Sequence, residues 1–118
     1  MFLLQLLKSL KPTLDLPKPN QVRECLASAR ILIEAGWCQH TFHKDGDYCP
    51  IGAIFESAPT YTVATLARAQ FKVANSIRME GIECWNDKWY RFKFQVLRAF
   101  DRAIANIDNY EPIQEGTG

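Results

Sequence analysis

The sequence has almost no net charge and no apolar stretch long enough to cross a membrane. Fourteen basic and thirteen acidic residues leave a net charge of +1 over 118 residues, so no overall field draws the protein to a nucleic-acid backbone or an anionic membrane. A nucleic-acid role would need a local basic patch. Apolar residues make up 47% and charged residues 23% of the chain, which excludes the composition of a disordered protein.

The pattern of a secretory signal is also missing. The stretch Met1–Leu7 is apolar, but the basic residues Lys8 and Lys11 follow it instead of preceding it, the reverse of a signal peptide. The chain contains four cysteines, Cys25, Cys38, Cys49 and Cys84. In a chain without an export signal these indicate reduced thiols, not a disulfide framework. We therefore expect a cytoplasmic protein that does not associate with membranes.

No cofactor motif is apparent in the sequence. Gly52 and Ala53 open an apolar stretch, but the chain has neither a glycine-rich string nor a following Lys-Ser or Lys-Thr pair, so a phosphate-binding loop is excluded. Two adjacent small residues instead predict the close approach of another helix or of a ligand. We expect no bound cofactor.

Apolar residues recur at helical spacing in several stretches and predict one mainly α-helical domain. Helix boundaries follow from cap residues and helix breakers. The predicted helices run from Asn20 to Gly36, from Pro50 to Pro59, from Thr60 or Thr62 towards Gly81, and through Val96 to Ile107. A chain of this length supports one hydrophobic core, so we expect a single compact domain of about four helices.

The segments between these helices predict turns. Lys44–Asp47 has the composition of a tight turn, and it favours a loop or short β-hairpin between Thr41–His43 and Tyr48, after the first core helix. Ile82–Asp87 suits a capped turn. The predicted organisation is an N-terminal arm with a proline-rich connection (1–19), a helical domain (20–110) and a disordered tail (111–118).

Three motifs resemble a known family. They are Leu32–Gln39, Tyr48–Ile54 and Trp85–Asp87, the last followed by Arg91 and an aliphatic helix. Together, over about residues 22–106, they resemble an uncharacterised small helical domain of bacteria and phages. The resemblance implies a small helical fold but no established activity. One departure is Phe92, which stands where the family pattern has a threonine that would cap the last helix.

Cys38, His40, His43 and Cys49 form the strongest candidate metal site, because zinc prefers thiolate and imidazole ligands in a tetrahedral array. Structural zinc sites usually arrange their ligands as two short pairs, and this spacing is irregular. We therefore expect no metal, and a zinc site in the loop 37–49 is the alternative.

Cys49 is also the strongest candidate nucleophile. A thiol at a helix N-terminus lies at the positive end of the helix dipole, which favours the thiolate, and His40 or His43 is the candidate base. The apolar residues after Cys49 instead favour a buried, unreactive thiol. The sequence therefore predicts no catalytic residue, and a Cys/His-based enzyme or small ligand-binding protein is the alternative.

The motif Trp85-Asn86-Asp87 allows two interpretations. In the first, Trp85 fills the core while Asn86 or Asp87 accepts backbone hydrogen bonds in a local turn. In the second, aromatic side chains from two loops form a pocket with polar groups. The residues of that pocket would be Trp37, Tyr48, Trp85, Trp89 and Tyr90, with Asn86, Asp87 and Arg91 as its polar groups.

The run Lys88–Phe94 interleaves three basic residues with four aromatic ones. If all seven residues were helical, no single helix face could bury all four aromatics, so we expect some to be exposed, and exposed Trp and Arg are enriched in interface hot spots. The predicted binding residues are Trp37, Tyr48, Trp85, Asn86, Asp87, Lys88, Trp89, Tyr90, Arg91 and Lys93. We predict a non-enzymatic binding module for a protein partner, with nucleic acid as the alternative partner. The family resemblance implies a phage or bacterial origin and an inhibitor of a host-defence component.

Overall fold

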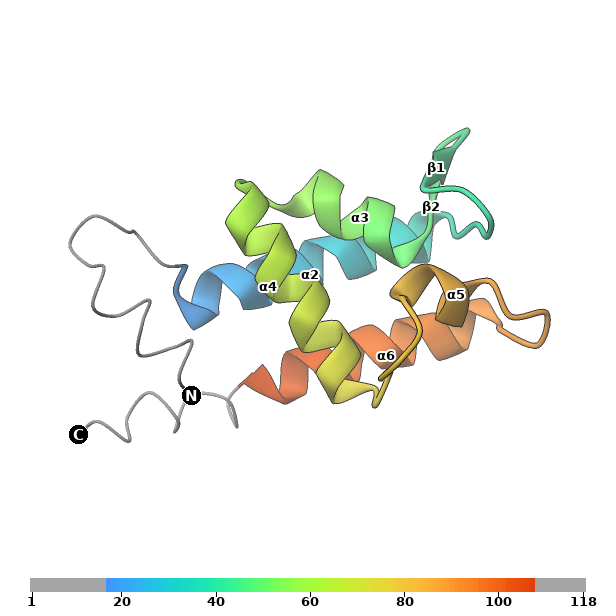
Figure 1. Ribbon diagram of the computed structural model, residues 1–118. Helices are drawn as coiled ribbons and strands as arrows, with labels where there is room; N and C mark the ends of the chain where they lie inside the picture. Colours follow the sequence, from blue (N-terminus) through green and yellow to red (C-terminus); the bar gives the residue numbers. More distant parts are fainter. Residues whose placement is uncertain (1–16, 108–118) are drawn as a thin grey trace.

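The computed structural model describes residues 17–107, which form one helical domain with a small hairpin (Figure 1). Its elements are α2 (Pro19–Ala35), β1 (His43–Lys44), β2 (Asp47–Tyr48), α3 (Pro50–Ser57), α4 (Tyr61–Ala74), α5 (Ile82–Asn86) and α6 (Lys93–Ala105). The predicted mainly helical domain, with a hairpin after its first core helix, is confirmed. Most of the predicted arm and the predicted tail 111–118 lie outside the described residues. Within residues 17–107, no helix has both the length and the apolarity needed to span a bilayer.

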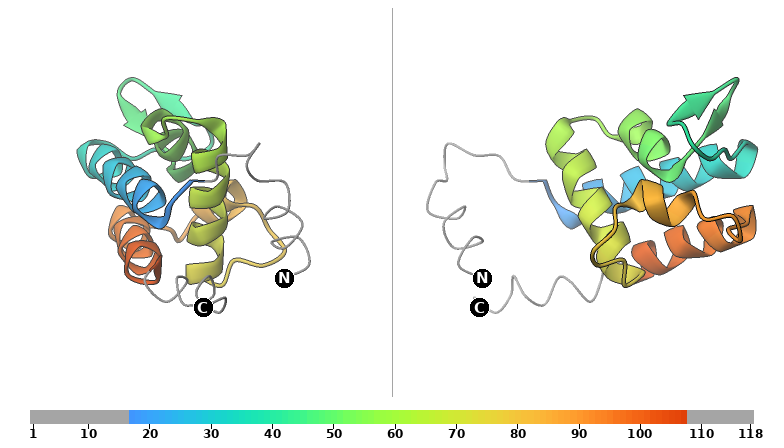
Figure 2. Two further views of the ribbon diagram at one scale, coloured as in Figure 1. Left: turned by 90° about the vertical axis from the view of Figure 1, so that its left-hand side faces the viewer. Right: turned by 45° about the vertical axis from the view of Figure 1, so that its right-hand side comes forward.

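The core lies between α2, α3, α4 and α6. Helix α2 contacts the other three, and α4 crosses α2 and α6 (Figures 1 and 2). The apolar positions of α2 that recur at helical spacing are all buried: Val22, Cys25, Leu26, Ala29 and Ile33. Phe71 of α4 and Phe100 of α6 meet edge to face, with ring centroids 4.9 Å apart. Such aromatic pairs add to the free energy that burial alone contributes.

Helix α2 begins one residue before the predicted Asn20. Pro19 occupies the first helical position, where its missing N–H is not needed. Lys18 is the N-cap residue, and its backbone N–H donates to Oε1 of Gln21 at 2.8 Å. Asn20 therefore does not cap the helix, and its side chain accepts a hydrogen bond from Arg23 at 2.9 Å. Pro19, the last proline of the connection, therefore belongs to the helix.

Two glycines permit close approaches of the backbone near the hairpin. Gly36 ends α2 as predicted, in an extended conformation with φ −175°, and a Cβ there would collide with the side chain of Asp47. A Cβ on Gly52 would collide with the carbonyl oxygen of Phe42. The close approach predicted at Gly52 therefore exists, but the group that approaches is a loop backbone.

Helix α4 is shorter than the predicted span towards Gly81. Thr60 caps its start as predicted, because its Oγ1 accepts from the N–H of Val63 at 3.2 Å. The helix ends at Ala74, where the side chain of Asn75 donates to the carbonyl oxygens of Phe71 at 2.9 Å and Ala99 at 3.1 Å. These bonds tie the end of α4 to α6.

The predicted capped turn at Ile82–Asp87 is in fact the short helix α5, with Asp87 as its C-cap. Helix α6 then begins after Phe92, which occupies the N-cap position without a side-chain oxygen. Gln95 partly compensates, since its Oε1 accepts from the backbone N–H of Phe92 at 2.8 Å. This is one half of a capping box.

Candidate functional site

The three sequence motifs meet at one end of the molecule, where the hairpin, α5 and the segment after α5 lie together (right-hand end of Figure 1). Trp37 and Tyr48 form an isolated parallel β-bridge. Its hydrogen bonds run from Tyr48 N–H to the Gly36 carbonyl at 2.9 Å and from Cys38 N–H to the Tyr48 carbonyl at 3.1 Å. The first two motifs are thus joined through their backbones.

Asn86 joins the third motif to the first. It is fully buried, accepts a hydrogen bond from Nε1 of Trp37 at 2.8 Å and donates one to the carbonyl of Cys38 at 3.1 Å. The side chain of Gln39 donates in return to the carbonyls of Asn86 at 2.7 Å and Lys88 at 2.9 Å. Asn86 therefore does not make the local turn contact of the first interpretation, and it connects the end of α5 to the loop after α2.

Asp87 contacts His40, the residue after Gln39 in the loop that follows α2. Its Oδ1 accepts from the backbone N–H of His40 at 2.8 Å, and its Oδ2 lies 3.6 Å from Nδ1 of that imidazole. His40 has φ 69°, in the left-handed region that non-glycine residues seldom adopt. The two contacts to Asp87 help to maintain this conformation.

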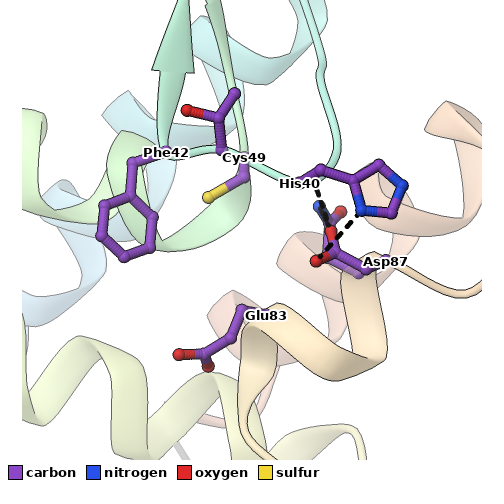
Figure 3. A pocket seen from close by; sticks show the side chains of 7 residues that line it. His40, Phe42, Cys49, Glu83 and Asp87 are labelled. Atoms are coloured by element: carbon purple, nitrogen blue, oxygen red, sulfur yellow. Dashed lines mark hydrogen bonds and ion pairs between the residues drawn. The ribbon is translucent and has the colours of Figure 1, made fainter.

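Between the loop and α5 lies an open pocket with a volume of about 380 Å³. It is lined by His40, Thr41, Phe42, Cys49, Glu83, Asn86 and Asp87. Figure 3 shows the sulfur of Cys49 on the side of Phe42 and Glu83, while the imidazole of His40 lies over Asp87. Cys49 and His40, the alternative catalytic pair, thus share a pocket, whereas His43 stacks on Tyr48 with ring centroids 4.4 Å apart.

The chemistry of Cys49 is that of a packed thiol. The side chain is 3% exposed, and its sulfur accepts from the N–H of Gly52 at 3.4 Å. Burial raises the pKa of the Cys49 thiol, although the backbone hydrogen bonds of Gly52 and Ile51 act in the opposite direction. Within residues 17–107, no hydrogen bond joins Cys49 to a histidine. The thiolate that nucleophilic catalysis requires is therefore disfavoured.

The alternative zinc ligands do not converge. Within the described part of the chain, no three His, Cys, Asp or Glu side chains form a group that could hold a metal ion. The thiol of Cys38 faces the carbonyl of Thr41 at 3.6 Å, and burial, with the charges of Cys49 and Asp47, raises its pKa. His40 faces Asp87 and His43 faces Tyr48, so the four side chains have separate partners.

Four aromatic side chains beyond α5 are exposed, and we call them the aromatic edge. The exposed fractions are 89% for Trp89, 45% for Tyr90, 58% for Phe92 and 58% for Phe94. The rings of Trp89 and Tyr90 pack edge to face at 5.5 Å, and those of Phe92 and Phe94 stack at 6.2 Å. The expectation that the run Lys88–Phe94 exposes some of its aromatics is confirmed.

Behind the aromatic edge lies a group of residues that connect the loops, which we call the framework: Trp37, Tyr48, Trp85, Asn86, Asp87 and Arg91. Trp85 and Arg91 are the two members that lie next to the edge in the sequence. Trp85 is half-buried and packs edge to face on Phe71, with ring centroids 5.6 Å apart. The guanidinium carbon of Arg91 lies 4.0 Å from the centroid of the Trp85 ring, and its Nε donates to the Trp85 carbonyl at 2.9 Å. Arg91 is therefore folded back onto the protein.

The ten predicted binding residues thus divide into two groups. Trp37, Tyr48, Trp85, Asn86, Asp87 and Arg91 connect the loops, whereas Lys88, Trp89, Tyr90 and Lys93 belong to the segment of the aromatic edge. Of the five aromatics of the predicted pocket, Trp89 is 89% exposed and packs on Tyr90, whereas Arg91 contacts both the Tyr90 and the Trp85 rings. Sequence reasoning missed Thr41, Phe42 and Glu83 as pocket residues, since only the packing of the loop after α2 against α5 brings them together.

Comparison with known proteins places the chain in a family without assigning an activity. A family of unknown function, DUF6197, matches residues 17–106. No curated protein and no solved structure matches the chain. Because the family match covers most of the sequence, the chain belongs to this family, which confirms the resemblance inferred from the three motifs.

Proposed function

We propose that this member of the DUF6197 family is a non-enzymatic binding module that engages a protein partner through its aromatic edge. The observation that carries the proposal is the exposure of Trp89, which is 89% accessible, together with that of Tyr90, Phe92 and Phe94 in the same short segment. Contiguous exposed apolar patches mark interaction sites on soluble domains. A host-defence component is the kind of partner that the phage resemblance suggests.

The residue types of the aromatic edge suit an interface. Tyr and Trp provide large contact areas with few rotatable bonds, and they dominate interface hot spots. A central Trp is worth on the order of 2 kcal/mol or more of binding free energy at such a site. In the free protein Trp89 contacts Tyr90 alone among the aromatic rings described, so most of its surface is available to a partner.

The segment that carries the edge is pre-organised. The side chain of Gln39 holds the Lys88 carbonyl at 2.9 Å, and the N–H of Arg91 donates to that same carbonyl at 3.0 Å. The bond from Arg91 Nε to the Trp85 carbonyl fixes the turn from the other side. A segment held in this way loses less conformational entropy on binding than a free loop.

The pocket beside Cys49 favours an enzyme less than the edge favours binding. A nucleophilic cysteine needs a lowered pKa and a base within hydrogen-bond reach. Burial instead raises the pKa of Cys49, and the imidazole of His40 is turned to Asp87. These two observations support a binding module over a Cys/His enzyme.

Site-specific photo-crosslinking in the native host tests the proposal. A photo-reactive amino acid at Trp89 or Phe94 should capture a discrete protein, whereas the same group at Tyr61 or Ile31 should not. Both control side chains are exposed, at 73% and 65%, and α4, which begins at Tyr61, starts far from α5 in Figure 1. Purified wild-type protein should suppress the product, and Trp89→Ala protein should not. Equal capture at all four positions, or equal suppression by both competitors, would contradict the proposal.

A further inference from the structure

We propose that the partner presents an acidic protein segment with apolar side chains, which lies on the aromatic edge and the first turn of α6. The inference rests on the proposed function and specifies its partner. The charges around the four rings specify the partner, because apolar contact alone does not select one partner over another.

The basic charge of this surface is not neutralised from within. The segment 88–94 contains three basic residues and no acidic one. Lys88 is paired with Glu80 at 3.3 Å, but neither Arg91 nor Lys93 has an ion-pair partner within residues 17–107. Arg91 lies over the rings of Trp85 and Tyr90 and donates to the Trp85 carbonyl, and none of these groups carries a formal negative charge. Two positive charges therefore lie beside the exposed rings.

The start of α6 adds to this field. The first turn contains no acidic side chain, and Phe92 at the N-cap has no side-chain oxygen that could accept from the first N–H groups. The helix dipole contributes a partial positive charge at the same end. A carboxylate of a partner beside Lys93 would meet the ammonium group and the positive helix terminus together.

The extent of the positive surface favours a protein segment over a single-stranded nucleic acid. A nucleic acid brings a phosphate with every base, and its binding usually requires a long basic groove. Here two uncompensated cations are followed on the α5 side by the carboxylates of Glu83 and Asp87, which line the pocket. A continuing phosphate backbone would be repelled there, whereas a peptide can place one or two carboxylates and then apolar or basic residues.

The experiment measures binding of fluorescein-labelled probes to the complete chain by anisotropy. The first probe is a short peptide in which Asp and Glu alternate with Trp, Phe and Leu. The second replaces the acids by Lys, the third replaces the apolar residues by Ala, and the fourth is an oligothymidylate. The first probe should bind about tenfold or more tightly than each of the others, because it alone combines both features.

Substitutions in the protein show which residues bind the first probe. Trp89→Ala and Lys93→Glu should each weaken the first probe about tenfold. Arg98→Glu, the same charge reversal at an exposed position of α6, should change it less than about twofold. Lys93→Gln serves as the milder variant if Lys93→Glu unfolds, and circular dichroism verifies the fold of each. Binding of the first probe should also weaken as salt increases.

The outcomes separate this inference from the proposed function. If a protein is crosslinked at Trp89 but the acidic probe binds no better than the others, the inference of an acidic partner segment is wrong, while the proposed binding function remains supported. Tighter binding of oligothymidylate than of the acidic peptide would overturn the partner class. Equal loss of binding in Lys93→Glu and Arg98→Glu would show that the probe responds to overall charge, which also contradicts the inference.

Discussion

Trp37 donates a hydrogen bond from its indole nitrogen to the side chain of Asn86 across 2.8 Å, and Asn86 is completely buried. This bond joins the loop after α2 to the end of α5. A buried amide is stable only when its donors and acceptors are satisfied, and Asn86 meets this requirement by donating to the Cys38 carbonyl as well. The contact places a polar side chain at the centre of the framework behind the aromatic edge.

Replacing Asn86 by alanine should therefore destabilise the protein by roughly 2 to 4 kcal/mol, because it leaves the Trp37 indole N–H and the Cys38 carbonyl without partners. Urea unfolding measures the change. Asn20→Ala is the control, since Asn20 is exposed and bonds only at the surface, and it should change stability by less than about 0.5 kcal/mol. Equal effects of the two substitutions would show that Asn86 does not hold the loops together.

Replacing Trp85 by alanine should reduce the stability of the protein much more than replacing Trp89 does. Trp85 packs on Phe71 and beneath Arg91, so Trp85→Ala should leave a cavity and destabilise the protein by about 3 kcal/mol. Trp89 is almost fully exposed, and Trp89→Ala should cost less than about 0.5 kcal/mol. Thermal melts followed by circular dichroism compare both variants with the wild type. If the Trp89→Ala protein melted as early as the Trp85→Ala protein, Trp89 would contribute to the fold, and its assignment to the accessible surface would be wrong.

The longer helices were predictable because their positions depend on neighbours in the sequence, whereas the short helix α5 was predicted as a turn. The apolar spacing from Val22 to Ile33 and the cap at Thr60 are local signals, and both appear in the structure. The end of α4 was not predicted: Asn75, which follows it, donates both to Phe71 in the same helix and to Ala99 in α6. Boundaries that depend on distant partners leave no periodic trace in the sequence.

The same distinction applies to the candidate site. The exposure of aromatics in Lys88–Phe94 is confirmed, although only Lys93 and Phe94 of the run belong to a helix, so the helix geometry assumed for the prediction does not apply to the rest. The roles of Asn86 and Arg91 did not follow, because their partners are backbone carbonyls and a ring whose positions only the fold determines. Asx and Arg side chains suit both local turns and long-range contacts, so residue type alone does not separate them.

Arg91 provides the clearest test of a framework role. Its guanidinium stacks on Trp85 and its Nε bonds the Trp85 carbonyl, so Arg91→Ala should destabilise the protein by about 1 to 2 kcal/mol. Arg91→Lys keeps the charge but not the planar group or the Nε donor, and it should recover less than half of that loss. Denaturant titrations of both variants are the measurement. Full recovery by lysine would indicate that charge alone matters at this position.

The cysteines give a prediction that also tests the enzyme alternative. Burial raises the pKa of Cys49 above its ordinary value and that of Cys25 to about 11, whereas Cys84 is exposed. Alkylation of the native protein at neutral pH should therefore label Cys84 first and leave Cys25 and Cys49 largely unmodified, because the thiolate is the reactive form. Peptide mass mapping over time measures each rate.

The pH dependence of stability follows from the same shifts, and its sign is fixed by linkage. Below the ordinary thiol pKa both the folded and the unfolded chain carry the proton, so these cysteines contribute no pH dependence there. As the pH rises above about 9, the unfolded thiols ionise while the buried ones stay protonated, and stability should fall until the folded-state pKa is passed. Cys25→Ala and Cys49→Ala proteins should each show a shallower alkaline loss than the wild type in urea titrations. Rapid labelling of native Cys49 at neutral pH, together with an unchanged alkaline slope in Cys49→Ala, would instead indicate an accessible thiolate in the pocket and favour the Cys/His enzyme.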